Sequence, residues 1–134
     1  MKLLPFLLFL AALLGLSASA HTVPFTDLSG QIAVPAVICG RSTQVVLDTG
    51  AAVGFAGQPY PGGQMLGNAP LPTVAGSLSG QWEVCSLRIA GLSEQVSGIV
   101  SPAYRYLPLI GTPALRKLSR VILVIWPLHE VVLI

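Results

Sequence analysis

The chain has 134 residues, which is enough for one small domain. Hydrophobic residues make up 53% of it and charged residues only 9%, with a formal net charge of +2. Because no basic patch with interleaved aromatic residues is present, we do not expect nucleic acid as a partner.

The first twenty residues have the organisation of a secretory signal peptide. Lys2 precedes an apolar run over residues 3–16, and Ala18-Ser19-Ala20 is a small-residue cleavage site. The apolar run is shorter than the roughly 17–25 residues of a spanning helix, so an uncleaved anchor is the weaker alternative. We therefore predict a signal peptide over residues 1–20, one mature domain over residues 21–134, and a secreted or periplasmic location. Membrane association is expected only if the segment stays uncleaved.

The two cysteines, Cys39 and Cys85, would then reach an oxidising compartment. Each lies in a segment that is typical of a strand, so a disulfide between them is one alternative and two buried free thiols are the other. The pair has no nearby histidines for a zinc site, and we expect neither a metal nor a cofactor.

A predicted hairpin ends on an isolated carboxylate. Residues 31–39 and 43–47 are strand-like and are joined by a short turn at residues 40–42. Pro35 indicates an edge position or a bulge in the first strand. The second strand leads directly into Asp48, one of only five acidic residues in the chain. A carboxylate in that position is unfavourable to bury without a purpose, so Asp48 is the first candidate catalytic residue.

The middle of the chain contains a Gly/Pro-rich stretch and a second predicted hairpin. Residues 54–72 are expected to form an irregular loop, either functional or a plain surface connection. Residues 73–84 predict a hairpin whose tip is Gly76-Ser77-Leu78-Ser79-Gly80. Glycines at both hinges and one apolar residue at the apex suit a lid over a substrate, although ordinary hairpins have similar tips.

The C-terminal third predicts a short helix between strands. Thr112 is a good N-cap and Pro113 suits the first helical position. Further strands are expected over residues 83–90, 95–100, 121–125 and 130–134. The chain therefore predicts an all-β fold with one short C-terminal helix.

Three of these features together resemble the retropepsin-like family of single-lobe, retroviral-type aspartic proteases. Leu47-Asp48-Thr49-Gly50-Ala51 is similar to the active-site motif of that family, and Leu109-Ile110-Gly111 before a short helix is similar to its second signature. The glycine-bracketed tip at residues 76–80 is similar to its flap tip. A bare Asp-Thr-Gly is weak on its own, but all three features occur in the family's order over residues 30–134. The resemblance implies a small, closed, β-barrel-like acid-protease lobe with a flap hairpin, and an aspartic endopeptidase activity.

The implied chemistry uses two carboxylates around one water. One carboxylate takes a proton from the water while the other polarises the scissile carbonyl, and no covalent intermediate forms. This chain supplies only one such aspartate, because the other, Asp27, lacks a following Thr-Gly. The second carboxylate is therefore expected from Asp48 of another copy, in a homodimer that meets at the active site and acts on a peptide or protein.

The resemblance also implies roles for the surrounding residues. Thr49 would hydrogen-bond across the two-fold axis, and Gly50 would permit the turn and donate its N–H to the carboxylate. Leu78 would cover the bound peptide. The remaining substrate contacts would be Ala51, Gly76 and Ser77, and the support beneath Asp48 would be Leu109, Ile110 and Gly111.

Two alternatives stay open. The first keeps the fold and drops the activity, leaving a secreted domain that binds peptides without cleaving them. The second is a copper-binding module, in which cleavage after Ala20 makes His21 the N-terminal residue and His129 completes a site of three nitrogens.

Overall fold

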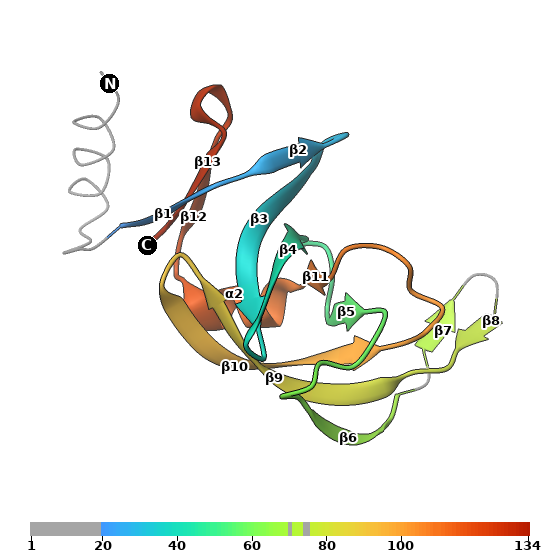
Figure 1. Ribbon diagram of the computed structural model, residues 1–134. Helices are drawn as coiled ribbons and strands as arrows, with labels where there is room; N and C mark the ends of the chain where they lie inside the picture. The colour runs from blue at the N-terminus through green and yellow to red at the C-terminus, as the bar shows by residue number, and fades with distance from the viewer. Residues whose placement is uncertain (1–19, 70, 74–75) are drawn as a thin grey trace.

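The computed structural model describes residues 20–69, 71–73 and 76–134, so all but the last residue of the signal peptide predicted over residues 1–20 lies outside the described residues. The predicted all-β class is confirmed (Figure 1). The helices are α2 (Thr112–Leu118) and the short 3-10 helix η1 (Trp126–Leu128). The strands are β1 (His21–Pro24), β2 (Thr26–Leu28), β3 (Gln31–Ile38), β4 (Arg41–Leu47), β5 (Gly54–Ala56), β6 (Gln64–Asn68), β7 (Leu71–Thr73), β8 (Gly76–Leu78), β9 (Gln81–Ile89), β10 (Leu92–Val100), β11 (Leu109–Ile110), β12 (Ile122–Ile125) and β13 (Glu130–Leu133).

The main sheet curls back on itself. Its eight strands follow the order β2-β3-β4-β11-β5-β10-β9-β6, and a further pairing joins β3 to β9. The pairings of β3, β4, β11, β5, β10 and β9 therefore form a continuous circuit, with the long curved strands β9 and β10 across its base in Figure 1. This circuit is the barrel-like lobe that the resemblance implied.

The β3–β4 hairpin leads to Asp48, as the sequence predicted. Cys39 and Gly40 form a two-residue turn in which both residues have positive φ, 46° and 79°. Such a turn matches the twist of the two strands, and it fixes the register with Ile38 opposite Arg41.

Pro35 lies inside a sheet yet breaks no ladder. The tight turn makes Ile38 and Arg41 a hydrogen-bonded pair, and the alternation of antiparallel pairs then directs the nitrogen of Pro35 away from β4. On that side β3 pairs with β2 up to Ala33 and with β9 from Val37 onward. The proline thus occupies the interval between two partners, rather than the edge position or the bulge that the sequence suggested.

The Gly/Pro-rich stretch over residues 54–72 is more ordered than predicted, because it contains β5, β6 and β7. Between β5 and β6 it packs against the body: Tyr60 is buried, and a Cβ on Gly63 would lie 2.5 Å from the Glu83 carboxylate. A Cβ on Gly62 would lie 3.1 Å from the Cys39 carbonyl oxygen. These glycines are therefore needed for close packing, which composition alone does not distinguish from a loop.

The second hairpin is real, but its predicted tip was wrong. β6 and β7 form one leg and β8 and β9 the other, since β6 pairs with β9 and β7 pairs with β8. Gly76 lies opposite Thr73, so the segment predicted as the tip begins as a strand. The connection at residues 74 and 75 lies outside the described residues.

The C-terminal part forms α2 and a second, three-stranded sheet in the order β1-β13-β12. The helix starts one residue earlier than predicted, with Gly111 as N-cap and Thr112 as its first residue. Arg116 and Lys117 lie in the last turn, where positive charge is favourable to the helix dipole. The predicted closing hairpin is present as β12 and β13, and the segment expected to be irregular or at an edge contains β1 and β2.

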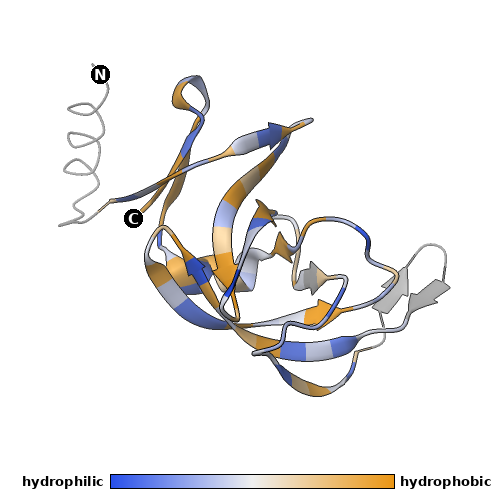
Figure 2. Cartoon of the chain, in the orientation of Figure 1, coloured by the Kyte–Doolittle hydropathy of each residue, from blue (hydrophilic) through white to orange (hydrophobic). Residues whose placement is uncertain are grey.

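Every second residue of β9 from Glu83 onward is buried. Figure 2 shows that hydrophobic and hydrophilic residues are interspersed along this strand and its neighbours. In β9 the inward positions are Glu83, Cys85, Leu87 and Ile89, of which Glu83 is 5% exposed. One carboxylate therefore points into the core. Among the described residues no helix has the length and apolar character needed to cross a membrane.

Candidate active site

Asp48 lies immediately after β4 and next to β11. The two strands pair in parallel, with Val46 opposite Leu109 and Leu47 opposite Ile110. The N–H of Asp48 donates to the carbonyl of Ile110 at 3.0 Å. The structure thus brings together the two segments that the sequence singled out, although they are about sixty residues apart.

The turn after β4 holds the Asp48 carboxylate from one side. The backbone N–H of Gly50 donates to Asp48 Oδ1 at 2.8 Å, which is the contact that the resemblance implied. The φ angle of Gly50 is outside the left-handed region, so a glycine is favoured here by space: a Cβ would lie 3.3 Å from the same carboxylate oxygen. Asp48 itself is half-buried, while Thr49 and Gly50 are exposed.

The start of α2 fixes this turn from behind. A Cβ on Gly111 would lie 2.7 Å from the Ala51 carbonyl oxygen, so only glycine allows this approach. The N–H of Thr112 donates to Ala51 O at 3.0 Å, and its Oγ1 donates to Thr49 O at 2.6 Å. Thr112 was predicted as a helix cap; its hydroxyl instead ties the helix to the active-site turn.

A groove opens beside the carboxylate. It has a volume of about 250 Å³ and is lined by Gly30, Gln31, Ile32, Val46, Leu47, Asp48 and Thr49. A neighbouring hollow of about 350 Å³ shares Gln31 and Val46 with it and adds Leu28, Tyr104, Tyr106, Leu107 and Leu109. Asp48 therefore borders an open groove with both polar and apolar lining, next to a more apolar hollow, and the two together are of the size that a peptide side chain fills.

Tyr104 is a site residue that the sequence reasoning did not select. Burial raises the pKa of its phenol, and the negative charges of Asp48 and then Tyr106 raise it further. Its hydroxyl donates to Leu107 O at 2.7 Å, and its ring meets that of Tyr106 edge-on at 5.6 Å. The available signal was two tyrosines in the loop before Leu109, but nothing in that pattern indicates which of them lies near Asp48.

The base of the lid-like hairpin is fixed to the body. Ser101 is buried, and its hydroxyl donates to Ser79 O at 2.8 Å. The N–H of Ala69 donates to Gly80 O at 2.9 Å across the two legs. Gly76, Ser77 and Leu78 lie in β8 above this anchor, and their contacts with substrate, like that of Ala51, stay predictions.

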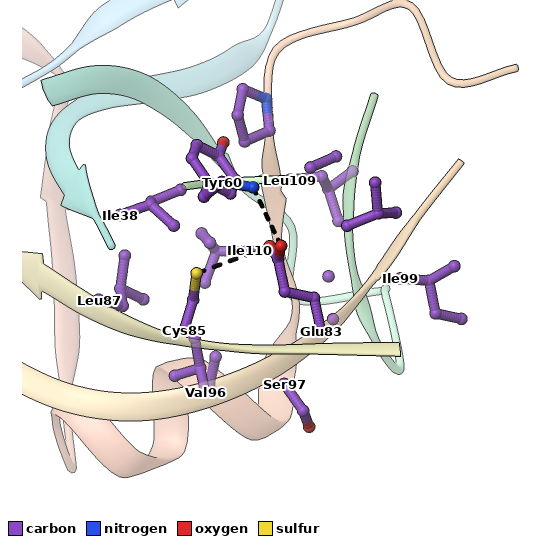
Figure 3. A pocket seen from close by; sticks show the side chains of 16 residues that line it. Ile38, Tyr60, Glu83, Cys85, Leu87, Val96, Ser97, Ile99, Leu109 and Ile110 are labelled. Atoms are coloured by element: carbon purple, nitrogen blue, oxygen red, sulfur yellow. Dashed lines mark hydrogen bonds between the residues drawn. The ribbon is translucent and has the colours of Figure 1, made fainter. Parts of the chain in front are cut away.

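The carboxylate of Glu83 lies inside the lobe, away from Asp48 (Figure 3). Glu83 borders a cavity of about 50 Å³, and its Oε2 accepts the N–H of Tyr60 at 3.0 Å. Burial raises the pKa of Glu83, and the Tyr60 N–H offsets part of that rise. Cys39 and Cys85 form a disulfide with Cα atoms 5.3 Å apart, and Cys85 Sγ lies 3.6 Å from Glu83 Oε1. This sulfur carries no proton to donate, so the approach is a packing contact.

The two histidines of the copper alternative lie at opposite ends of β1. His21 is opposite Leu133 and its Nδ1 lies 2.9 Å from Ala90 O, whereas His129 packs against Phe25 with ring centroids 5.2 Å apart. Four residues of strand separate the two positions, or about 13 Å. In the described residues no cluster of three or more metal-ligating side chains occurs. The structure does not bring the proposed copper ligands together.

Comparisons with known proteins agree with the geometry at the level of the fold. No protein-family model matches the chain, and no curated protein matches it either. Among solved structures, the chain is similar to the retroviral EIAV protease complexed with the inhibitor HBY-793, with a TM-score of 0.57. The two are 17% identical, and the similarity covers 73% of this chain and 98% of that one. This likeness shows a retroviral-protease-like fold.

Proposed function

We propose that the protein is an aspartic endopeptidase that works as a homodimer. The observation that carries the proposal is the position of Asp48: it follows a strand supported by β11, accepts the Gly50 N–H at 2.8 Å, and opens onto a groove, in a fold like that of a retroviral protease. The predicted signal peptide adds that the enzyme acts outside the cytosol, secreted or in a periplasm.

The chemistry requires two such carboxylates, and this chain offers one at the site. Asp27, the other aspartate, is used at the β2–β3 turn, where its Oδ1 accepts the N–H of Gly30 at 2.7 Å. Glu83 is enclosed in the lobe. We therefore take the second carboxylate to be Asp48 of a partner subunit, related by a two-fold axis, with Thr49 of each subunit joining the two turns.

In this arrangement the two carboxyl groups share one proton, because like charges so close together do not both ionise readily. The ionised group takes a proton from a water held between them, and the water oxygen attacks the scissile carbonyl carbon. The protonated group donates to the carbonyl oxygen, giving a tetrahedral diol. Transfer of a proton to the amide nitrogen then breaks the C–N bond and releases both products.

The first prediction is the loss of proteolysis in Asp48→Asn. The assay is cleavage of an unstructured protein from acidic to neutral pH, with and without a statine-type inhibitor. We expect the rate to fall by about 10³-fold or more, because the amide cannot accept the proton of the water. Asp27→Asn is the matched control: it removes the other aspartate, at the β2–β3 turn, and should leave the rate within about twofold.

Specific activity should also rise with protein concentration as the dimer forms. Equal rates for wild type and Asp48→Asn would contradict the catalytic role of Asp48 and favour a domain that binds peptides without cleaving them. An active enzyme that is strictly monomeric would contradict the shared site.

A further inference from the structure

The disulfide joins one cysteine near the surface to one inside the lobe. Cys39 lies in the turn between β3 and β4, is half-buried, and is followed by the exposed Gly40. Gly62 packs against this turn, and it is exposed and has no side chain to cover Cys39. Cys85, in β9, is only 5% exposed. A thiol in solution can therefore approach the disulfide from the Cys39 side, whereas the Cys85 sulfur faces the interior.

The buried carboxylate of Glu83 is placed to exchange a proton with that inner sulfur. Its Oε2 accepts the N–H of Tyr60 at 3.0 Å, and its Oε1 lies 3.6 Å from Cys85 Sγ (Figure 3). Because Oε2 already serves as an acceptor, the proton of a neutral Glu83 belongs on Oε1, next to the sulfur. Burial raises the pKa of Glu83, so the neutral form persists into a pH range in which an exposed glutamate is ionised.

Among the described residues around the cavity, Glu83 is the group that changes charge on the acidic side of neutral pH. The residues opposite it in the sheet are Met65 in β6 and Gly98 in β10, which carry no charge. The cavity lining from β3, β5, β11 and α2 is uncharged as well. The phenol of Tyr60 stays neutral, because burial and then the charge of Glu83 raise its pKa more than Arg41 lowers it.

We infer that this disulfide is an exchange site for dithiols, at which Glu83 gives its proton to the departing Cys85 sulfur. A thiolate of the dithiol attacks Cys39 Sγ, the S–S bond breaks, and its electron pair goes to Cys85 Sγ. A thiolate in apolar surroundings is unfavourable, so the leaving sulfur requires a proton. The proton on Glu83 Oε1 lies beside it, and its transfer leaves a Cys85 thiol and an ionised Glu83.

The second thiol of the dithiol completes the reaction. It loses its proton to water and attacks the reagent's own sulfur in the mixed disulfide, and Cys39 leaves as a thiolate that takes a proton from water. The dithiol thus loses two electrons and two protons. The two cysteines gain two electrons and two protons, of which Glu83 supplies one. One proton therefore appears in solution for each disulfide that opens.

Backbone contacts keep the two cysteines together after the disulfide opens. The N–H of Cys39 donates to Ser86 O at 2.8 Å, and Ile38 lies opposite Leu87 where β3 pairs with β9. The ionised Glu83 can accept both the Tyr60 N–H and the Cys85 S–H. In the reverse reaction it takes the proton of Cys85, and the resulting thiolate attacks a mixed disulfide at Cys39. The disulfide can therefore open and close while the lobe stays folded.

The first test measures the protons released when dithiothreitol reduces the wild type at constant pH, between pH 5 and 7.5. We expect the release to approach one proton per disulfide opened within this range. A disulfide without a proton donor releases none, because both protons of the reagent pass to the two cysteines. Circular dichroism follows the strands during reduction. The absence of release, or release that appears only as the strands are lost, would overturn the inference.

The second test compares Glu83→Gln with wild type. The amide has no proton to give, so the variant should release none and should react about tenfold or more slowly with dithiothreitol thiolate at pH 6. Glu94→Gln, which removes an exposed acid from β10, is the matched control and should behave like the wild type. Equal rates and equal proton release in Glu83→Gln and wild type would contradict the role of Glu83. Neither readout depends on Asp48, so a positive result in a protein without proteolytic activity would support the exchange site while contradicting the proposed catalysis.

Discussion

Two carboxylates of this chain have the same kind of backbone partner and opposite surroundings. Asp48 accepts the N–H of Gly50 at 2.8 Å, and Glu83 accepts the N–H of Tyr60 at 3.0 Å. Asp48 is half-buried at the end of a strand and opens onto a groove. Glu83 is 5% exposed, faces a small cavity and lies against a disulfide.

The difference separates a carboxylate that is accessible from a groove from one that is enclosed by the fold. Asp48 opens onto a groove, where the proposed peptide substrate and partner subunit would lie. The lobe leaves space of only about 50 Å³ beside Glu83, enough for a few water molecules but not for a peptide. Changes around Glu83 should therefore alter stability, and changes around Asp48 should alter the rate.

The largest expected effect on stability is that of removing the disulfide. Replacing Cys39 and Cys85 by serine should lower the free energy of unfolding by roughly 2–4 kcal/mol, because the bridge closes a loop with a sequence separation of 46. Urea denaturation measures this loss. Reduction of the wild type by dithiothreitol is the matched control, since it breaks the same link without changing any side chain. The protein that remains folded should cleave substrate at the wild-type rate. A loss of activity larger than the loss of folded protein would show that the disulfide region affects the Asp48 site as well as stability.

The position of Asp48 at the end of a strand and beside Leu109 and Ile110 was predictable from sequence, and the burial of Glu83 was not. An aspartate between a buried strand and Thr-Gly has a local signature, and so does Leu109-Ile110-Gly111 before a helix. Glu83 has no such signature, because its burial depends on β9 pairing and on Gly63 packing against it from a distant part of the chain. The structured packing of residues 54–63 escaped prediction for the same reason.

The next effect concerns the close approach behind Asp48. Gly111→Ala places a Cβ 2.7 Å from the Ala51 carbonyl oxygen and 3.0 Å from that of Val53, so the active-site turn must shift. We expect a loss of about 1–3 kcal/mol in the free energy of unfolding and a fall in kcat larger than the loss of folded protein explains. Ala52→Ser, an exposed change in the same turn, is the control. Wild-type kcat in folded Gly111→Ala would show that the turn tolerates the shift and that its support is purely structural.

Helix α2 marks the limit of this sequence reasoning on the Asp48 side. The existence of the helix and a proline near its start were predicted from sequence, but Thr112 was assigned to the cap. The hydroxyl donates to Thr49 O instead, because the turn after β4 lies beside the helix start. A cap preference is local, whereas the competing acceptor comes from a segment sixty-three residues away.

The smallest expected effect is a change in the pH dependence of stability through Glu83. Burial raises its pKa above the ordinary value of 4.5, so the folded protein binds this proton more tightly than the unfolded chain does. Its contribution to stability is therefore fully present below pH 4.5 and is lost as the pH rises through the folded-state pKa. The phenol of Tyr60, next to it, stays neutral throughout this window, because burial and the charge of Glu83 raise its pKa further above 10.0, more than Arg41 lowers it.

Glu83→Gln keeps the shape and an acceptor for the Tyr60 N–H but removes the titration. Between pH 4 and 8 the urea midpoint of the wild type should fall with rising pH, and that of the variant should fall less. Glu94→Gln, an exposed acid on the neighbouring strand β10, is the matched control for removing one negative charge. If the urea midpoints of Glu83→Gln and wild type change equally with pH, Glu83 is ionised inside the lobe. Glu83 and Asp48 would then differ only in whether a substrate can reach them. If only the slope changes while cleavage persists, the enclosed carboxylate favours the folded lobe under acidic conditions without taking part in catalysis.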